Sequence, residues 1–439
     1  MYHAHHEQRR RRMKDDNDGD VDASSDNLYE TGALYQGYGT HYLDLWLGTP
    51  DPQRQTVIVD TGSSVTAFPC TGCDNCGSNP TTRERYHLDE DFDVGASATY
   101  KEKSCNSGKR NKDGKMVGRK TCELGWCAEG HRCKVEVSYA EGSSWSAVEG
   151  SDVVYPAGPH DAALGSQEQR LAEGVGAGMG SLTGDGQEGK DFDWMDFRLK
   201  FGCQMKVTGL FRTQLEDGIM GMDNRKGSFW LQLNDHYKRN GYARGDASPS
   251  NGDAAASFDP AQFSLCFDRQ SLSADLRPGV GSGALTLGGT DRLLHNTPMV
   301  YAENVTPHGG WYSVRIKAMF LRTHGGTLSE PFADASAVEY HRVNADEHTL
   351  NGQQDKNRGV ILDSGTTDTY LPQGLRGPFD RAWNAALGGE GVMARYHNEP
   401  EEMAPDEVRT LPTILIVLQG HAQSNPADSN AIGMASSHE

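Results

Sequence analysis

The chain has no run of apolar residues long enough to cross a lipid bilayer. A spanning helix needs about 20 such residues, whereas the longest run among the 439 residues is the short stretch from Ile414 to Leu418. The N-terminus shows no apolar core of a secretory signal peptide either, since it begins with histidines and Arg9 to Arg12. The sequence therefore predicts no membrane span, and no signal peptide is visible in it.

Positive charge is scarce as well. There are 42 Lys and Arg residues against 61 Asp and Glu residues, so the formal net charge at pH 7 is -19. Binding to nucleic acid depends on Lys and Arg that neutralise phosphates, so this balance argues against a nucleic-acid partner. An acidic surface loses charge as the pH falls, which suits an acidic compartment. The mean hydropathy of -0.66 is low for a fully packed globule and indicates polar tails or insertions.

The chain is too long for one hydrophobic core, which rarely grows beyond about 250–300 residues. We therefore expect two lobes, at 34–258 and 259–418, with a polar insertion near 239–259 at their junction. Residues 1–33 are Arg-rich and then Asp-rich without apolar periodicity, and residues 419–439 are rich in Ala, Ser and Asn. Both ends are expected to be disordered tails.

Nine cysteines are present, and seven of them fall between positions 70 and 133. Such clustering is typical of a local disulfide framework and hence of an oxidising compartment. A metal site is the alternative, because the first three form CxxCxxC, but zinc sites usually pair such a motif with a second half downstream. We favour disulfides, and the odd count leaves one thiol over. The cysteines are Cys70, Cys73, Cys76, Cys105, Cys122, Cys127, Cys133, Cys203 and Cys266.

Short alternating stretches bounded by turn residues predict a mostly β chain. A β-hairpin is expected over 135–156, because alternate apolar residues from Val135 to Tyr139 lead into a Glu-Gly-Ser-Ser turn at 141–144. Apolar spacing indicates helices at 229–233 and 379–387. Further strands are expected at 43–47, 199–203, 263–267, 284–289, 311–319 and 411–418.

One motif occurs twice. The stretch VIVDTGSSVTAFP at 57–69 returns as VILDSGTTDTYLP at 360–372, and its carboxylates Asp60 and Asp363 lie 303 residues apart. In each copy β-branched residues lead into an Asp-(Thr/Ser)-Gly turn, so each acid should stand where a buried strand ends. The repeat predicts two similar half-structures that each offer one carboxylate to a shared site.

Two buried carboxylates a few Å apart cannot both ionise cheaply, so they share one proton. The ionised partner can draw a proton from water while the protonated one donates to a carbonyl oxygen, which is general acid–base hydrolysis. Hydroxyl groups beside each acid can orient its oxygens, and glycine lets the backbone approach closely. A single Asp-Thr-Gly would more often be a plain turn; the duplication is what indicates chemistry.

These motifs resemble those of pepsin-like aspartic proteases, and most closely the Cys-rich nepenthesin-type and beta-secretase-type members. The resemblance rests on VIVDTGSS, SYAEGSSWSAVEGSDVV, DGIMGM, FSLCF, ALTLGG and VILDSGTT, in the family's order over about 34–418. It implies a mostly β, bilobal fold of two similar β-barrel-like lobes with a cleft between them. It further implies a monomer of the secretory pathway, vacuole or extracellular space that acts on peptides or proteins without metal or cofactor.

The resemblance also implies residue roles. Asp60 and Asp363 match the catalytic pair, Thr61 and Ser364 match the hydroxyls that cross-link the two acid loops, and Gly221 matches the backing apolar-apolar-Gly segment. The remaining matches are the dyad-supporting Gly62, Ser63, Gly365 and Thr366, and the flap residues Tyr139, Gly142 and Ser143. We therefore expect an aspartic endopeptidase that activates water between Asp60 and Asp363 at acidic pH.

Two departures from the family pattern qualify this expectation. Ala67 stands where a tryptophan often partners the flap tyrosine, and Trp145 is expected to substitute for it. After Asp363 the second backing segment is matched only by Ala431-Ile432-Gly433, so the second lobe is expected to be incomplete and the chain truncated. Cys266 resembles a family cysteine whose partner lies in that missing region. The alternative hypothesis is therefore an inactive pepsin-like binding protein or a truncated inactive product.

Overall fold

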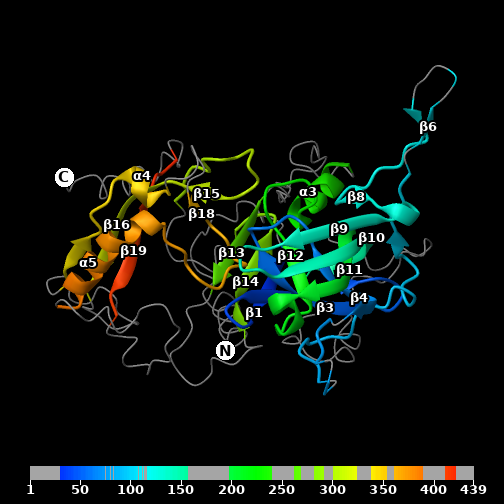
Figure 1. The fold of residues 1–439 in the computed structure, drawn as a ribbon, viewed down its shortest axis with the longest axis horizontal. Helices are drawn as coiled ribbons and strands as arrows, with labels where there is room; N and C mark the ends of the chain where they lie inside the picture. The colour runs from blue at the N-terminus through cyan, green and yellow to red at the C-terminus, as the bar shows by residue number, and fades with distance from the viewer. Residues whose placement is uncertain are drawn as a thin grey trace, which may run out of the picture. The chain divides into compact units, whose positions relative to one another are not determined.

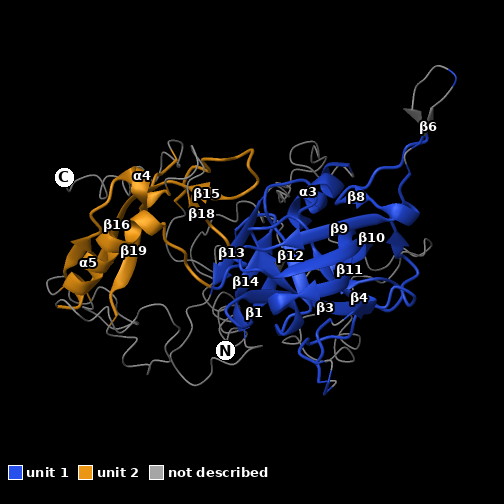
Figure 2. Ribbon diagram, viewed as in Figure 1, with its two compact units in different colours: residues 1–270, 276–294, 364–367 blue, residues 271–275, 295–363, 368–439 orange. Residues whose placement is uncertain are grey.

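The computed structural model describes residues 30–421, except for 157–196, 240–261, 268–280, 291–299, 324–337, 353–359, 389–410 and isolated positions between 75 and 115. The predicted tails lie almost wholly outside the described residues, as does most of the insertion at 239–259. Two compact units are present (Figure 2), one of 1–270, 276–294 and 364–367, the other of 271–275, 295–363 and 368–439.

The structure is mostly β, as predicted, and the first unit is built on one large mixed sheet (Figure 1). Along the sheet the order is β13-β14-β1-β2-β3-β12-β4-β11-β10-β9-β8, with β5 paired to β10. The main strands are β1 (Glu30–Gln36), β2 (His41–Leu47), β3 (Gln53–Asp60), β4 (Ala67–Asp74), β9 (Cys133–Ser138), β10 (Ser144–Pro156), β11 (Phe197–Thr208), β12 (Gly218–Gly221), β13 (Phe263–Phe267) and β14 (Gly281–Leu287).

Six of these strands close on themselves. The run β2-β3-β12-β4-β11-β10 returns to its start because the long strand β10 bends back to β2, where Val154 pairs with Leu47. Closure leaves fewer unpaired strand edges, which is how barrels avoid exposing backbone donors and acceptors. The predicted hairpin is confirmed as the β9–β10 pair, in which Ser138 faces Ser144.

The barrel encloses an apolar core. Leu43, Leu45 and Leu47 of β2 are fully buried, and Asp44 between the first two is only 4% exposed, so the strand is covered on both faces there. The stacked rings of Phe68 and Phe201 have centroids 4.6 Å apart in this core. Helix α3 (Phe229–Arg239) covers β11 from outside, with the ring of Phe229 edge-on to that of Phe197 at 5.2 Å. It is longer than the predicted 229–233.

Strands β13 and β14 belong to this sheet, although the sequence places them in the second lobe. β14 pairs with β1 from Glu30↔Leu287 to Tyr35↔Gly281, so β1 begins four residues before the predicted start at Leu34. Residues 30–33 have little apolar pattern of their own and take their order from this pairing. The lobe boundaries themselves stay predictions.

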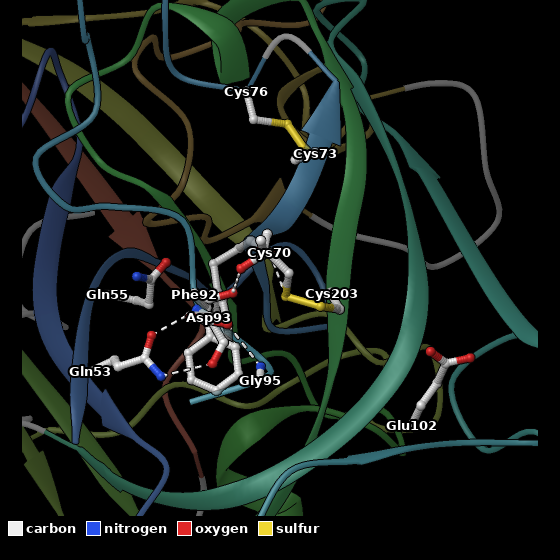
Figure 3. Close-up of a disulfide and its surroundings, with 12 residues drawn as sticks. Gln53, Gln55, Cys70, Cys73, Cys76, Phe92, Asp93, Gly95, Glu102 and Cys203 are labelled. Carbon is white, nitrogen blue, oxygen red and sulfur yellow. Dashed lines mark hydrogen bonds between the residues drawn. A yellow bond between two sulfur atoms is a disulfide. The ribbon is translucent and has the colours of Figure 1, made fainter. Parts of the chain in front are cut away.

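The prediction that the clustered cysteines form disulfides is confirmed. The pairs are Cys70–Cys203, Cys73–Cys76, Cys105–Cys127 and Cys122–Cys133. Figure 3 shows the first two at successive points along β4. The Cys-rich insertion carries only short elements, which are β5 (Lys101–Glu102), β6 (Lys109–Arg110), β7 (Met116–Val117), β8 (Trp126–Cys127) and the 3-10 helix η1 (Glu129–His131).

The second unit has a smaller core around β16 (Ile316–Arg322). This strand lies between β17 (Tyr340–Arg342) and β19 (Thr413–Leu418), and Ile316, Met319 and Leu321 pack against helix residues Leu350 and Ala382. A separate pair joins β15 (Ser313–Val314) to β18 (Val360–Ile361). The helices are α4 (Glu347–Leu350), α5 (Arg376–Ala386) and the 3-10 helix η6 (Gln373–Leu375). No described helix is long and apolar enough to cross a membrane.

Candidate active site

Asp60 stands at the end of the buried strand β3, as the motif predicts. Val57, Ile58 and Val59 before it are 0–6% exposed, and the carboxylate residue itself is 3% exposed. β12 runs parallel beside it, with Gly221 opposite Asp60. A side chain at 221 would collide with the backbone of Ser64, so the close approach of the two segments requires glycine.

Donors from the same turn orient the Asp60 carboxylate. The Gly62 amide donates to Oδ1 at 2.8 Å, and the Ser63 hydroxyl donates to Oδ2 in a short hydrogen bond. The two residues after β12 hold the backbone of the turn, since Met222 N donates to Asp60 O at 2.7 Å and Asp223 N to Ser63 O at 3.0 Å. The first acid is therefore held by its own turn and by the segment behind it.

The first unit also contains Ser364–Thr367, four residues of the second motif copy. Ser364 N donates to Thr61 Oγ1 at 2.9 Å, and Thr61 N donates to Ser364 Oγ at 3.2 Å. Ser364 Oγ in turn donates to Val59 O at 2.6 Å. Gly365 lies so near the first acid that a Cβ there would stand 2.9 Å from Asp60 Cβ. The structure thus brings Asp60, Thr61, Ser364 and Gly365 together.

Tyr139 lies at the start of the hairpin turn and reaches the Asp60 loop. Its hydroxyl accepts from Trp145 Nε1 at 3.3 Å, its ring centroid is 5.2 Å from that of Phe211, and it lies near Ser63 and the Asp60 carboxylate. Burial, together with the nearby Asp60 charge, raises the pKa of the Tyr139 phenol above its ordinary value. The chain of contacts runs from Trp145 through Tyr139 and Ser63 to Asp60.

The turn of this hairpin explains the other two predicted residues. Tyr139 N donates to Ser143 O at 2.9 Å, and Gly142 adopts a φ of 96°, which favours glycine. Ser143 is 2% exposed, and its Oγ accepts from Leu210 N at 2.9 Å in the 3-10 helix η3 (Gly209–Arg212). Gly142 shapes the tip, whereas Ser143 anchors the turn.

The expected substitution by Trp145 has a packing basis. A side chain at Gly202 would meet Ala67 Cβ at 3.2 Å and the Trp145 ring at 3.3 Å, so the indole lies over two small residues. Trp145 is 2% exposed. Ala67 and Trp145 belong to the same buried apolar cluster.

Asp363 is described within the second unit, where its surroundings differ from those of Asp60. β18 leads into it and pairs with β15, and Leu362 N donates to Tyr312 O at 2.9 Å. Ile361 and Leu362 are 39% and 50% exposed, in contrast to the buried residues before Asp60. Thr366, the counterpart of Ser63, is exposed.

The Asn304 side chain supports that second strand pair. Its Nδ2 donates to Trp311 O at 3.2 Å and its Oδ1 accepts from Thr306 N at 3.0 Å. Thr306 Oγ1 donates to Ser313 Oγ at 2.8 Å. β15 is therefore clamped on one side by this turn while it carries β18 on the other.

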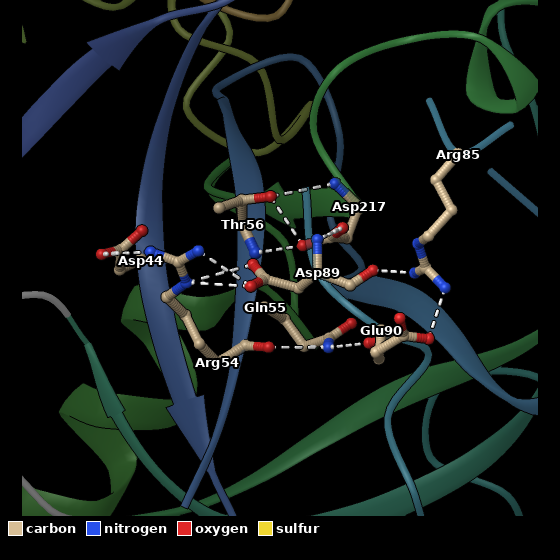
Figure 4. A network of polar contacts seen from close by, with 8 residues as sticks. All are labelled: Asp44, Arg54, Gln55, Thr56, Arg85, Asp89, Glu90 and Asp217. Atoms are coloured by element: carbon tan, nitrogen blue, oxygen red, sulfur yellow. Dashed lines mark hydrogen bonds and ion pairs between the residues drawn. The ribbon is translucent and has the colours of Figure 1, made fainter. Parts of the chain in front are cut away.

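A buried acid that sequence reasoning treated only as part of DGIMGM is Asp217, at the start of the backing segment. Thr56 N and Oγ1 each donate to Asp217 Oδ2 at 2.6 Å, and Asp89 N donates to Oδ1 at 2.9 Å (Figure 4). Arg54 Nη2 binds the Asp89 carboxylate at 2.9 Å. Burial, and then the Asp89 charge, raise the pKa of Asp217 to about 8. Its position directly before β12 was the sequence feature that could have pointed to this acid.

Comparison with known proteins finds similarity to two proteins named as proteases over part of the chain, and no family model matches. The chain is 33% identical to Aspartic protease 5 of Toxoplasma gondii over 198 residues, which are 45% of this chain and 16% of that protein. It is 30% identical to Plasmepsin V of Plasmodium falciparum (isolate 3D7) over 189 residues, 43% of this chain and 23% of that protein.

These relatives are pepsin-like aspartic proteases, so the resemblance drawn from the motifs is confirmed. The aligned part spans less than a quarter of the length of either relative. The disulfides are typical of proteins of the secretory pathway or of organelles.

Proposed function

We propose that this chain is an aspartic endopeptidase in which Asp60 and Asp363 activate a water molecule for attack on a peptide carbonyl. The observation that carries the proposal is the Asp60 loop itself. Its carboxylate is buried, oriented by Gly62 and Ser63, and touched by Gly365 of the second motif copy. Asp363 directly precedes Ser364, whose two reciprocal hydrogen bonds with Thr61 join the two copies.

The roles of the two acids follow from carboxylate chemistry. One ionised acid accepts a proton from water, and the protonated partner donates to the carbonyl oxygen, so no covalent intermediate forms. A pair of this kind works while it shares one proton, which puts the working range at about pH 3–5. Tyr139 and its hairpin would close over the substrate and exclude water.

The substrate class proposed is a peptide or protein, bound by a monomer without metal or cofactor. The compartment proposed is the secretory pathway, with the vacuole or the extracellular space as destinations. The four disulfides support an oxidising compartment. The relatives are named as proteases, which supports the reaction class.

The test is cleavage of a denatured protein at pH ~3–5, the range in which a carboxylate dyad shares its proton. Asp60→Asn and Asp363→Asn should each lower kcat by about 10²–10⁴-fold, since each removes one acid–base group. Asp235→Asn, on the exposed side of α3, is the matched control and should be silent. Statine-type inhibitors of the pepstatin kind should block the wild type. Equal cleavage by the Asp60→Asn variant would sink the assignment.

A second function, that of a non-catalytic pepsin-like binding protein, is favoured by one observation. Ile361 and Leu362 are exposed beside Asp363, whereas Ile58 and Val59 are buried beside Asp60. An acid on a poorly covered strand is less firmly positioned. Statine-inhibitor or peptide binding by a wild-type protein that cleaves nothing would support this function over the first.

A further inference from the structure

The proposed proteolysis makes no use of the Cys73–Cys76 disulfide, which closes a C-x-x-C sequence at the end of β4. We propose that this disulfide exchanges with dithiols while the protein stays folded, and that the hairpin carrying Tyr139 senses its redox state. The inference is independent of whether the protein is a protease. It rests on loop length, on access to one sulfur, and on the apolar cluster that the pair shares with the hairpin.

Loop length separates this disulfide from the other three. Its cysteines are 3 residues apart, against 133, 22 and 11 residues for Cys70–Cys203, Cys105–Cys127 and Cys122–Cys133. A disulfide stabilises a fold in proportion to the chain entropy that it removes, and by linkage the fold stabilises the disulfide equally. The fold therefore holds the long-range pairs oxidised, while it contributes least to Cys73–Cys76.

One of the two sulfurs can be approached from solvent. Cys73 is half-buried and follows the exposed residues Thr71 and Gly72, whereas Cys76 is 8% exposed. A dithiol can therefore reach Cys73. Access alone is not decisive, because Cys127 is exposed too; loop length distinguishes the two pairs.

The exchange is a two-electron transfer in two steps. A thiolate of the dithiol attacks Cys73 Sγ, the Cys73–Cys76 bond breaks, and Cys76 leaves as a thiolate that takes up a proton. The second thiol of the dithiol then attacks the reagent's own sulfur in the mixed disulfide. This step releases Cys73 as a thiol and the dithiol as its cyclic disulfide. The Asp74 carbonyl oxygen, 3.7 Å from Cys76 Sγ, is in place to accept from the new thiol.

The pair lies in the apolar cluster that underlies the hairpin. Cys76 belongs to the buried set that includes Val135, Trp145 and Phe211, and Cys73 and Tyr139 pack against it partly buried. On reduction the two sulfur atoms are no longer bonded and move apart. Close-packed interiors transmit such a change of shape to neighbouring side chains. Val135 and Trp145 stand on the two hairpin strands and would pass it to the turn.

The experiment treats the folded, full chain with rising concentrations of dithiothreitol. Thiol alkylation followed by mass spectrometry reports each cysteine, and hydrogen exchange reports the Tyr139 and Gly142 amides that close the turn. We expect Cys73 and Cys76 to be alkylated before any other pair. Exchange at both amides should then accelerate by ~3-fold or more, as for a locally loosened segment. Amides of β14 should not change.

The Cys73→Ser/Cys76→Ser variant is the matched control. It should show the fast hairpin exchange without reductant and no further response to dithiothreitol. Earlier reduction of Cys105–Cys127, or reduction of Cys73–Cys76 only on unfolding, would overturn the proposal. Selective reduction with unchanged exchange at Tyr139 and Gly142 would overturn it as well. The wild-type measurement decides the matter even if the double variant does not fold.

Discussion

A glycine at position 365 determines how near the second motif copy comes to Asp60. Its ideal Cβ would overlap the Asp60 carboxylate and stand 2.9 Å from Asp60 Cβ. That contact is too short for real Cβ atoms, so an alanine would force the acid or the Ser364 turn to shift. The same turn carries the reciprocal Thr61–Ser364 bonds. The glycine of the second motif copy is therefore needed for more than a turn: it allows this copy to pack closely against Asp60.

Gly365→Ala should therefore lower kcat/KM by about 100-fold, because a displacement of about 1 Å at reacting groups has that effect. Gly281→Ala is the matched control, since a Cβ there meets nothing within 4 Å and the residue lies in β14. Cleavage assays and thermal unfolding of both variants separate activity from stability. Wild-type activity in Gly365→Ala would contradict the close approach.

At the scale of elements, the hairpin is tied to the acid loop through one indole. Trp145 Nε1 donates to the Tyr139 hydroxyl at 3.3 Å, and that hydroxyl lies near Ser63 of the Asp60 loop. Phenylalanine would keep the apolar contact with Ala67 and Gly202 but remove the donor. The hairpin could then close with Tyr139 in more than one position.

Trp145→Phe should lower kcat/KM by roughly 2–10-fold, which corresponds to a lost hydrogen bond of about 0.5–1.5 kcal/mol. Trp383→Phe is the control, because Trp383 Nε1 is buried without a hydrogen-bond partner among the described residues. A purely structural role would lower stability without changing kcat/KM. Equal kinetic losses in both variants would contradict a specific role for Trp145.

The sequence predicted single strands and helices better than it predicted how distant strands pair to close the barrel. The strand before Asp60, the hairpin and α3 follow from local patterns that need no distant partner. The return of β10 to β2 and the Cys70–Cys203 pair join residues more than 100 positions apart, which local patterns do not encode. The exposure around Ile361 could not be read from a motif that is buried in its first copy.

Within the site, the same division holds. The Asp60 turn and its oriented hydroxyl were predictable, because donor and acceptor are three residues apart. The buried Asp217 was not, since its partners Thr56 and Asp89 come from other parts of the chain. Whether an acid is buried depends on the packed fold, and burial is what changes its chemistry.

For the whole molecule, two buried groups of the first unit make the free energy of unfolding depend on pH in opposite directions. Burial raises the pKa of Asp217 to about 8, and burial lowers the pKa of His87 to about 4. Asp217 holds a proton that the unfolded chain releases above about pH 4, so its contribution to stability is lost as the pH rises from 4 to 8. The buried His87 stays neutral below about pH 6.5, where the unfolded chain takes up a proton. Its contribution to stability is therefore lost as the pH falls from 6.5 to 4.

Between pH 4 and 6.5 the changes in stability caused by Asp217 and His87 partly cancel. Between pH 6.5 and 8 only the change caused by Asp217 remains of the two. Wild type should therefore lose stability across that upper range, by up to about 1.4 kcal/mol per pH unit for one retained proton. Asp217→Asn should flatten this loss, because the amide carries no titrating proton and can still accept from Thr56 N. His87→Gln should change only the acid side. Denaturant unfolding at several pH values measures both slopes, and an unchanged loss in Asp217→Asn between pH 6.5 and 8 would show that another group causes it.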